Sequence, residues 1–475
     1  MKVLLIRPGH EHMITTNVPK SVDAETGMYP PLGLLCVAAG VVAWTDAEVR
    51  VLDAHALGLD AEGISREAAA YQPDVVGIQA MTFTLVDAID TVRAVKAARG
   101  RTHVCLGGPH VNLYPDETLA IAGVDSLVLG EGERPFADLV NALAAGGEAS
   151  DVPGVVSGGN GEPAAWRARE LEDDLDSLPH PARQLSDVSM YWSVLAKRRP
   201  ITTMMTSRGC PMKCIFCDRP HLGKSFRCRS AANVADEMSE CVAMGIHELF
   251  LYDDTFSINR NRVLAVCDEV ARRGLDVAWD IRARADTLDD EVVAALKKAG
   301  VARIHIGVES GSPRILKVMQ KGITVAQAHH AFELCRKHRI TSLAYFMFGN
   351  PTETQQDIDM TFDFLRKCRA DYAHIAVTTP FPGTQLYQMG LDQGLYSHDY
   401  WREFAADPRP SFSPPAWTEN FTFEELDAMR AQAYRKFYTR PGRVVREVLA
   451  IRSLKEFGAK ARLGMKLLLA RGESE

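Results

Sequence analysis

The chain has 475 residues, of which 46% are hydrophobic and 24% charged, and a formal net charge of −7. This length predicts two or three domains, and the composition is typical of a globular protein with a substantial core. Acidic and basic residues are interspersed, which argues against a protein that binds nucleic acid by neutralising phosphates. The first apolar run, 3–6, is too short for a signal peptide, and the longest, 34–44, is too short to span a bilayer. We therefore expect a cytoplasmic protein.

Short apolar runs alternate with helical patterns over residues 1–145. Such alternation predicts parallel strands joined by right-handed helical crossovers. The sequence therefore predicts an α/β, flavodoxin-like doubly wound domain, with its ligand beyond the carboxyl ends of the strands. The expected strands are 3–6, 48–52, 74–78, 103–107 and 126–129, and the expected helices are 31–44, 85–98 and 134–145.

Gly, Pro and acidic residues dominate 146–199, which we interpret as a linker between domains. Strand–helix alternation then resumes over 200–400 and predicts a partial (β/α)6 barrel, whose site would lie at the carboxyl ends of its strands. The spacing alone leaves open whether the barrel closes. The expected strands are 201–206, 248–252, 276–280, 303–308, 341–348 and 373–378, and the expected helices are 232–244, 260–273, 290–299, 325–337 and 355–369.

Residues 401–475 are expected to form a helical C-terminal region. Between 440 and 475 there are nine Lys or Arg residues against four Asp or Glu residues. Two interpretations stay open: a solvated helix packed on the barrel, and an interfacial helix near anionic lipid. Nearby aromatic residues fit either interpretation, and they are Phe421, Phe423, Tyr434, Phe437 and Tyr438.

Three of the ten cysteines, Cys210, Cys214 and Cys217, lie within eight residues. Three thiolates on one loop can ligate three irons of a [4Fe-4S] cluster, and the lack of a fourth ligand nearby leaves one iron open. Zinc is the alternative, but structural zinc normally takes four Cys or His ligands, and His221 and Cys228 do not form a convincing second pair. The other cysteines are isolated in apolar patterns, as small core residues usually are.

The spacing Cys-x3-Cys-x2-Cys, with Phe216 before the last cysteine, resembles the signature of the radical SAM superfamily. In that family the open iron binds S-adenosylmethionine (SAM), which is cleaved to a 5′-deoxyadenosyl radical. The resemblance implies that Phe216, Asp254 after the second barrel strand, and Glu309 and Ser310 after the fourth contact SAM. Glu353, after the fifth strand, is either near the adenine or a first-turn carboxylate stabilised by the helix dipole.

The first domain is similar to the cobalamin-binding modules that precede some radical SAM barrels. In those modules small residues and a Gly-Gly pair at strand ends accept the nucleotide tail of the corrinoid. Gln79 stands where the family usually has Ser, which is a departure. A Rossmann nucleotide domain is the competing interpretation, but it lacks Gly-x-Gly-x-x-Gly after the first strand. The residues that the resemblance places at cobalamin are Gln79, Met81, Gly107, Gly108, Gly130 and Glu131.

Three histidines are candidates for a ligand of the cobalt. His55 lies in an Asp-x-His-x-x-Gly motif like that of methionine-synthase-like modules, where the histidine ligates cobalt. Here the motif follows the second strand rather than the first, so we expect His55 to lie away from the cobalt. His10 and His12 follow the first strand, and either could approach the lower cobalt face or be a solvated loop residue.

The resemblance implies a cobalamin-dependent radical SAM enzyme, with a [4Fe-4S] cluster, SAM and cobalamin as cofactors and an external electron donor such as flavodoxin or ferredoxin. We expect it to methylate an unactivated carbon of a small or lipid-like substrate, because methyl transfer is the family's largest activity.

Two alternatives stay open. The architecture is similar to that of the anaerobic magnesium-protoporphyrin monomethyl ester cyclase and of a hopanoid cyclitol-ring enzyme, so cyclisation or rearrangement is one. A non-catalytic corrinoid-binding or iron–sulfur sensor is the other, although a sensor would need neither Asp254 nor Glu309. Peripheral contact with the inner face of the membrane would come through the C-terminal region.

Overall fold

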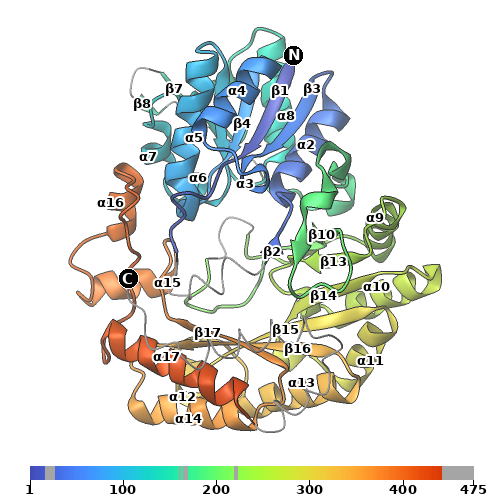
Figure 1. Ribbon diagram of the computed structural model, residues 1–475, viewed down its shortest axis with the longest axis vertical. Coiled ribbons are helices and arrows are strands. Elements are labelled where there is room, and N and C mark those ends of the chain that lie inside the picture. Colours follow the sequence, from blue (N-terminus) through green and yellow to red (C-terminus); the bar gives the residue numbers. More distant parts are fainter. Residues whose placement is uncertain (16–26, 160–161, 164–169, 219–222, 441–475) are drawn as a thin grey trace, which may run out of the picture.

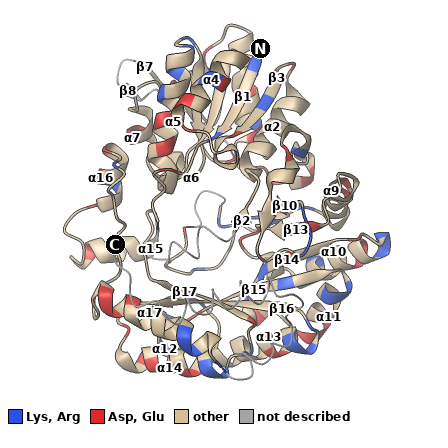
Figure 2. Ribbon diagram, viewed as in Figure 1, with Lys and Arg blue, Asp and Glu red and all other residues tan. Residues whose placement is uncertain are grey.

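The computed structural model describes residues 1–15, 27–159, 162–163, 170–218 and 223–440. Two sheets with their covering helices lie one above the other in Figure 1, and the helices of the C-terminal region run along one side. Acidic and basic residues are intermingled over both domains, as Figure 2 shows, in keeping with the mixed charge of the sequence.

The first domain is built on a seven-stranded sheet in the order β3-β1-β4-β5-β6-β7-β8. Its first five strands are parallel and the last two are antiparallel. The parallel part has the flavodoxin-like order that the sequence predicts. The strands are β1 (Lys2–Arg7), β3 (Glu48–Asp53), β4 (Val75–Gln79), β5 (His103–Gly107), β6 (Ser126–Val128), β7 (Val155–Gly159) and β8 (Glu162–Pro163).

Helices cover both faces of this sheet (Figure 1). One pair, α2 (Leu32–Trp44) and α8 (Glu133–Ala144), packs on one face, and α4 (Ala61–Tyr71) and α5 (Leu85–Ala98) pack on the other. The sequence analysis does not predict α4, because Ile64 and Tyr71 are its only large apolar residues. Short helices follow two of the strands, and they are α3 (Ala54–Leu57), α6 (Pro109–Leu113) and α7 (Pro115–Leu119).

The segment expected to be a linker, 146–199, belongs partly to each domain. Strand β7 extends the first sheet beyond residue 145, because Val155 and Val156 are apolar and pair with the edge of β6. Further along, β9 (Trp192–Ser193) pairs with β2 (Gly27–Met28). The expected boundary at residue 145 is therefore too early.

The second domain has six parallel strands in chain order, β10-β13-β14-β15-β16-β17. Over the described residues, β10 and β17 each pair on one side only, so the barrel is partial, as expected. The strands are β10 (Ile201–Met204), β13 (Glu248–Leu251), β14 (Ala278–Ala283), β15 (Val301–Glu309), β16 (Thr341–Phe348) and β17 (Tyr372–Val377).

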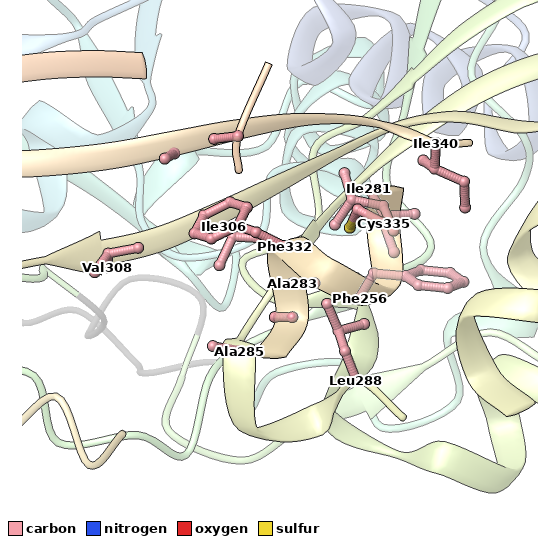
Figure 3. Packing of buried hydrophobic residues seen from close by; sticks show 14 of the residues in the cluster. Phe256, Ile281, Ala283, Ala285, Leu288, Ile306, Val308, Phe332, Cys335 and Ile340 are labelled. Atoms are coloured by element: carbon pink, nitrogen blue, oxygen red, sulfur yellow. The ribbon is translucent and has the colours of Figure 1, made fainter. Parts of the chain in front are cut away.

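The outer face of the barrel carries its apolar core. Figure 3 shows Ile281 and Ile306, from neighbouring strands, packed with Phe332 of a covering helix. Capping boxes begin three of the described helices, at Thr324, Thr354 and Thr422. The helices are α9 (Ala231–Ala243), α10 (Arg260–Arg273), α11 (Asp290–Lys298), α12 (Pro313–Val318), α13 (Val325–Lys337), α14 (Gln355–Lys367), α15 (Gln385–Asp392), α16 (Tyr400–Ala406) and α17 (Phe423–Tyr438).

Helix α17 lies along β17, the last strand of the barrel. The Ile375 N–H donates to the Tyr434 hydroxyl at 2.9 Å, and the Ala373 N–H donates to the Tyr438 hydroxyl at 3.2 Å. Phe437 is fully buried beside them. These aromatic residues therefore face the barrel and not a lipid surface. The basic segment 441–475 lies outside the described residues, in which we find no helix both long and apolar enough to cross a bilayer.

Candidate functional site

The three cysteines lie on a loop whose base is closed by a short ribbon. Strand β11 (Ser207–Arg208) precedes the loop and pairs antiparallel with β12 (Arg227–Cys228) behind it. At the entry, the buried Asp253 carboxylate accepts hydrogen bonds from the Thr206 N–H and the Ser207 hydroxyl, both at 2.6 Å. The loop is therefore held at both ends before any ligand binds.

The residues on this loop suit an iron–sulfur cluster. Cys210 and Cys214 are 9% and 8% exposed, and Cys217 is exposed at the rim. Within the described ranges, no three His, Cys, Asp or Glu side chains converge as the ligands of a single ion would. A [4Fe-4S] cluster needs no such convergence, because each thiolate binds a different iron.

Two cations that the sequence analysis missed lie beside the cysteines. Burial raises the pKa of the Cys214 thiol, while the charges of Lys321 and Arg284 lower it. Lys321 Nζ also lies 2.6 Å from the Glu309 carboxylate and 5.7 Å from the centre of the Phe216 ring. No motif marks Lys321 or Arg284, since the fold brings them to the loop from distant strand ends.

The residues expected at SAM divide into two groups. Phe216 and Glu309 meet at Lys321, and Asp254 lies close enough to Cys217 to raise the pKa of its thiol, after the larger effect of desolvation. Glu309 has φ +71°, a left-handed conformation that non-glycine residues rarely adopt and that is found at functional sites. Ser310 is buried instead in the turn after β15, where its hydroxyl contacts that of Thr361 at 3.1 Å.

Glu353 is a structural carboxylate. It is fully buried and accepts hydrogen bonds from the N–H groups of Gly349 at 2.8 Å and Asn350 at 2.9 Å. Burial raises its pKa to about 7, although these hydrogen bonds lower it. Glu353 therefore fixes the loop that follows β16; it precedes the N-cap Thr354 of α14, so the first-turn interpretation of this residue is wrong.

The carboxyl edge of the first sheet fits a corrinoid at two of the predicted glycines. A Cβ atom built on Gly107, the last residue of β5 opposite Gln79, would meet no neighbour closer than Val128 at 3.9 Å. One built on Gly130, where φ is +73°, would have its nearest neighbour at 3.8 Å. Both glycines thus border free space that a side chain would fill. Met81 lies half-buried just beyond β4.

Gly108 is required by the fold itself. Its φ is +126°, and an added Cβ would lie 2.7 Å from the carbonyl oxygen of Ala80. Asn112, which the sequence analysis missed, links this turn to the next, because it donates to the Gly108 carbonyl at 3.1 Å and accepts from the Gly130 N–H at 2.7 Å. The two glycine loops are therefore one bonded unit.

Glu131 points to the barrel. Its carboxylate lies 3.0 Å from Arg208 and 2.8 Å from Arg227, the two arginines of the ribbon below the cysteine loop. Burial would raise the pKa of Glu131, but hydrogen bonds and charges from these arginines lower it overall. The side chain thus serves the domain interface, and only its main chain remains for a ligand next to Gly130.

His10 and His55 lie together. Their rings stack with centroids 3.7 Å apart, because β1 and β3 are neighbours and Arg7 pairs in register with Asp53. The sequence analysis expected His55 to lie away from the cobalt and did not predict this contact with His10. Burial, and then His55 and Arg7, lower the pKa of His10 to about 3, so His10 is neutral at physiological pH. His12 lies on the opposite side of its loop, with Nδ1 3.4 Å from the Asp87 carboxylate.

A cleft of about 520 Å³ lies between the two domains. Cys214 and Cys217 form part of its wall, and Leu113 and Tyr114, just beyond the glycine turn of the first domain, form another part. The cysteine loop and the end of α6 in the first domain therefore face one space. The remaining lining residues are Lys224, Gly383, Thr384, Gln385, Tyr387, Gln388, Leu391, Asp399 and Arg402.

Comparison with known proteins agrees with this geometry. Residues 204–365 match the Radical SAM superfamily, and residues 23–140 match the B12 binding domain. An uncharacterized methyltransferase of Pyrococcus horikoshii is 33% identical over 451 residues, which are 94% of this chain and 95% of that protein. The chain belongs to the cobalamin-binding radical SAM enzymes. This radical SAM enzyme accordingly uses a [4Fe-4S] cluster, SAM and cobalamin.

Two further similarities describe the radical SAM enzyme. The anaerobic magnesium-protoporphyrin IX monomethyl ester cyclase of Rubrivivax gelatinosus is 27% identical over 397 residues, 82% of this chain and 70% of that one. The structure of OxsB, a cobalamin-dependent SAM radical enzyme solved with aqua-cobalamin and SAM, superposes with a TM-score of 0.75 at 17% identity. It covers 98% of this chain and 71% of OxsB, and it establishes a common fold.

Proposed function

We propose that the enzyme methylates an unactivated carbon atom of a small or lipid-like substrate bound in the interdomain cleft. The observation that carries this proposal is the shared wall of the cleft, where Cys214 and Cys217 face Leu113 and Tyr114. When bound, the cluster with SAM supplies an organic radical and cobalamin supplies a methyl group. A substrate between the two loops would be within reach of both.

Each predicted residue has a part in this proposal. Cys210, Cys214 and Cys217 hold the cluster, and Phe216, Asp254 and Glu309 contact SAM. Ser310, whose hydroxyl already contacts Thr361, positions the turn beside Glu309. On the first domain, the residues that border the corrinoid are Gln79, Met81, Gly107, Gly108 and Gly130, together with the main chain of Glu131.

The cluster needs an external one-electron donor, for which flavodoxin or ferredoxin is suitable. Cys217 is the exposed member of the three cysteines, so the donor would approach on that side. Full-length enzyme reduced by flavodoxin should form 5′-deoxyadenosine at a rate that falls with salt, since encounter between charged proteins is screened.

Anaerobic reconstitution tests the reaction. The enzyme is loaded with iron, sulfide and hydroxocobalamin, and is then given a reductant, S-[methyl-¹⁴C]adenosylmethionine and a deproteinised cell extract. Methyl transfer predicts 5′-deoxyadenosine, S-adenosylhomocysteine and a radiolabelled product. A cyclisation, favoured by the similarity to the Rubrivivax enzyme, predicts 5′-deoxyadenosine with the label only in the released methionine and in no substrate-derived product.

Variants separate the SAM site from general damage. Glu309→Gln should lower the rate of 5′-deoxyadenosine formation at least tenfold with the cluster retained, because the Lys321 partner and the predicted SAM contact are lost together. Glu117→Gln, on α7 of the first domain, is the matched control and should keep the wild-type rate. A wild-type rate in Glu309→Gln would contradict its place in the SAM site.

A further inference from the structure

The inner face of the partial barrel is polar. Side chains alternate along each strand, so the neighbours of the outward Ile281, Ile304 and Phe346 point inward. The interior of a closed parallel barrel is usually packed with branched apolar residues. Here the inward positions are filled by polar and charged side chains instead, and they include Asp280 and Arg282 on β14, Arg303 and His305 on β15, Tyr345 on β16 and His374 on β17.

Three of these side chains form a hydrogen-bonded chain across three strands. The Tyr345 hydroxyl lies 2.6 Å from His305 Nδ1, and His305 Nε2 lies 3.1 Å from the Asp280 carboxylate. The other carboxylate oxygen of Asp280 accepts from the Leu251 N–H at 3.1 Å. A carboxylate only accepts hydrogen bonds, so this network assigns the proton of His305 to Nε2. Nδ1 is then an acceptor, and Tyr345 donates to it.

Only one end of this chain is open. Asp280 and His305 are 2% and 8% exposed, whereas Tyr345 is half-buried. Since the proton of Tyr345 goes to His305, the lone pairs of its oxygen remain for a ligand. Burial raises the pKa of Tyr345 to about 12, and the charge of Arg282 lowers it, so the phenol is neutral near pH 7.

Tyr345 is close to the site described above. It lies near enough to Glu309, at the end of β15, and to Tyr29, from the first domain, for their charges to act on it. Arg282 is half-buried beside it, with its guanidinium 4.5 Å from the ring centre of Tyr252. No carboxylate of the described chain forms an ion pair with Arg282. The open end of the chain thus faces charged and aromatic groups of both domains.

We propose that Asp280, His305 and Tyr345 form a proton relay that contacts the substrate, and that the substrate carries a hydroxyl or an amino group. That group donates to the Tyr345 oxygen. On transfer, its proton passes to Tyr345 while the phenolic proton passes to His305 Nδ1, which leaves a deprotonated substrate oxygen or nitrogen and an imidazolium held by Asp280. Three side chains in this order act as a general base, as histidine–carboxylate pairs do in other enzymes. The inference rests on the proposed function and extends its substrate site inward along the barrel, because Tyr345 is not among the residues that line the cleft.

The first test uses chemical blocking of the substrate group. Holoenzyme with SAM and reductant is given a deproteinised cell extract, either untreated or treated with acetic anhydride, which caps hydroxyl and amino groups and leaves carboxylates unchanged. The readout is the increase in 5′-deoxyadenosine over the rate without extract. Acetylation should reduce this increase at least tenfold. An acetylated extract as effective as the untreated one would overturn the proposal.

The readout does not depend on methyl transfer, so a cyclising enzyme would respond in the same way. Failure of the proposed function would appear separately, as the absence of radiolabel from every substrate-derived product, with the label left in methionine. The experiment can therefore contradict the proton relay without contradicting methyl transfer, and methyl transfer without contradicting the relay.

The second test uses variants of the relay. Tyr345→Phe and His305→Gln should each lower the extract-dependent increase at least tenfold, relative to the same variant without extract, with iron and cobalamin contents unchanged. Tyr71→Phe, a tyrosine of the first domain that bonds only to the Glu48 carbonyl, is the matched control and should respond as the wild type does. A wild-type response in Tyr345→Phe would contradict the relay.

A pH profile distinguishes a relay from a structural contact. A general base acts only in its unprotonated form, so in the wild type the extract-dependent increase should rise with pH and then level off. His305→Gln should abolish that rise. If His305 had only a structural role, the variant would instead show a lower rate at every pH and the same pH dependence as the wild type. Other groups that face Tyr345 could shift the profile but persist in the variant, and they are Tyr29, Tyr252, Asp280, Arg282, Glu309 and His374.

Discussion

Arg208, two residues before the first cysteine of the cluster loop, lies 3.0 Å from the carboxylate of Glu131, the residue after Gly130 in the first domain. The same guanidinium pairs with Glu133 at 2.5 Å, and all three side chains are buried. Buried ion pairs therefore connect two loops: the one predicted to hold the cluster and the one predicted to border the corrinoid.

Removing the Glu131 charge should loosen the interface. Glu131→Gln leaves the buried Arg227 without its carboxylate and Arg208 with one partner instead of two, so we expect a loss of about 2 kcal/mol in the free energy of unfolding. Guanidinium denaturation of the apoprotein measures it. Glu62→Gln removes an exposed i,i+4 pair with Arg66 and should cost less than about 0.5 kcal/mol. Equal effects in the two variants would contradict the interface role.

The cluster prediction concerns metal content. Reconstituted wild type should bind about four irons and four sulfides per chain. The triple substitution of Cys210, Cys214 and Cys217 by Ala should abolish this, since no ligands would remain on the loop. Cys228→Ala, on the ribbon at the base of the same loop, is the matched control and should keep the cluster. Iron and sulfide analysis, together with the visible absorption spectrum, measures the cluster content of each variant. Full iron content in the triple variant would refute the assignment.

Substitution of Gly107 gives the clearest test of the predicted corrinoid site. Gly107→Leu should fill the space at the carboxyl edge without clashing with the fold, so the apoprotein should melt near the wild-type temperature but fail to retain hydroxocobalamin. Gly33→Leu, at an exposed position of α2 with no neighbour within 4 Å, should bind as the wild type does. Gly108 is a poorer choice, because its substitution strains the turn against Ala80. Stoichiometric retention by Gly107→Leu would show that the corrinoid lies elsewhere.

The raised pKa of Glu353 predicts a pH-dependent stability. Its pKa is about 7 in the folded protein against an ordinary 4.5, so the folded state binds the proton more tightly. This contribution is complete below about pH 4.5 and is lost as the pH rises through 7, at a cost of roughly 3 kcal/mol. Glu353→Gln should flatten that part of the denaturation profile between pH 5 and pH 8. Asp359→Asn, at an exposed position of α14, the helix that follows this loop, should retain the wild-type slope, and an unchanged slope in Glu353→Gln would be the contrary result.

Much of the fold could be predicted from periodicity. The runs at 3–6 and 103–107 are continuous and apolar, and they are buried parallel strands as expected. The helix α4 was not predicted because its buried residues are Gly63, Ile64 and Ala68, and small residues give a weak hydrophobic period. The segment 146–199 was interpreted from its glycines and prolines, which mark turns but do not say that Val155 and Val156 would pair with β6.

The site residues that lie together on one loop could be predicted from the sequence. Those that come from distant parts of the chain could not. The cysteines fall in a single motif, so their spacing carried the prediction. Lys321, Arg284 and Asn112 have no motif: Lys321 follows α12, Arg284 follows β14 and Asn112 lies in α6, and only the fold brings each to its site. The direction of the Glu131 side chain depends on Arg208 and Arg227, which lie 77 and 96 residues further along the chain, so a local pattern could not contain it.

The contact of α17 with β17 has a consequence for association between chains. A partial barrel leaves the last strand with unpaired N–H groups, and such an edge is a template for strand addition by another molecule. Alternate residues of a strand present their N–H groups to the same side, and those of Ala373 and Ile375 are taken by Tyr438 and Tyr434. Helix α17 therefore covers the edge strand and prevents edge-to-edge aggregation. A closed barrel has no edge strand and would not need such a covering helix. A chain ending before residue 420 would expose this edge, and its tendency to self-associate should grow with protein concentration.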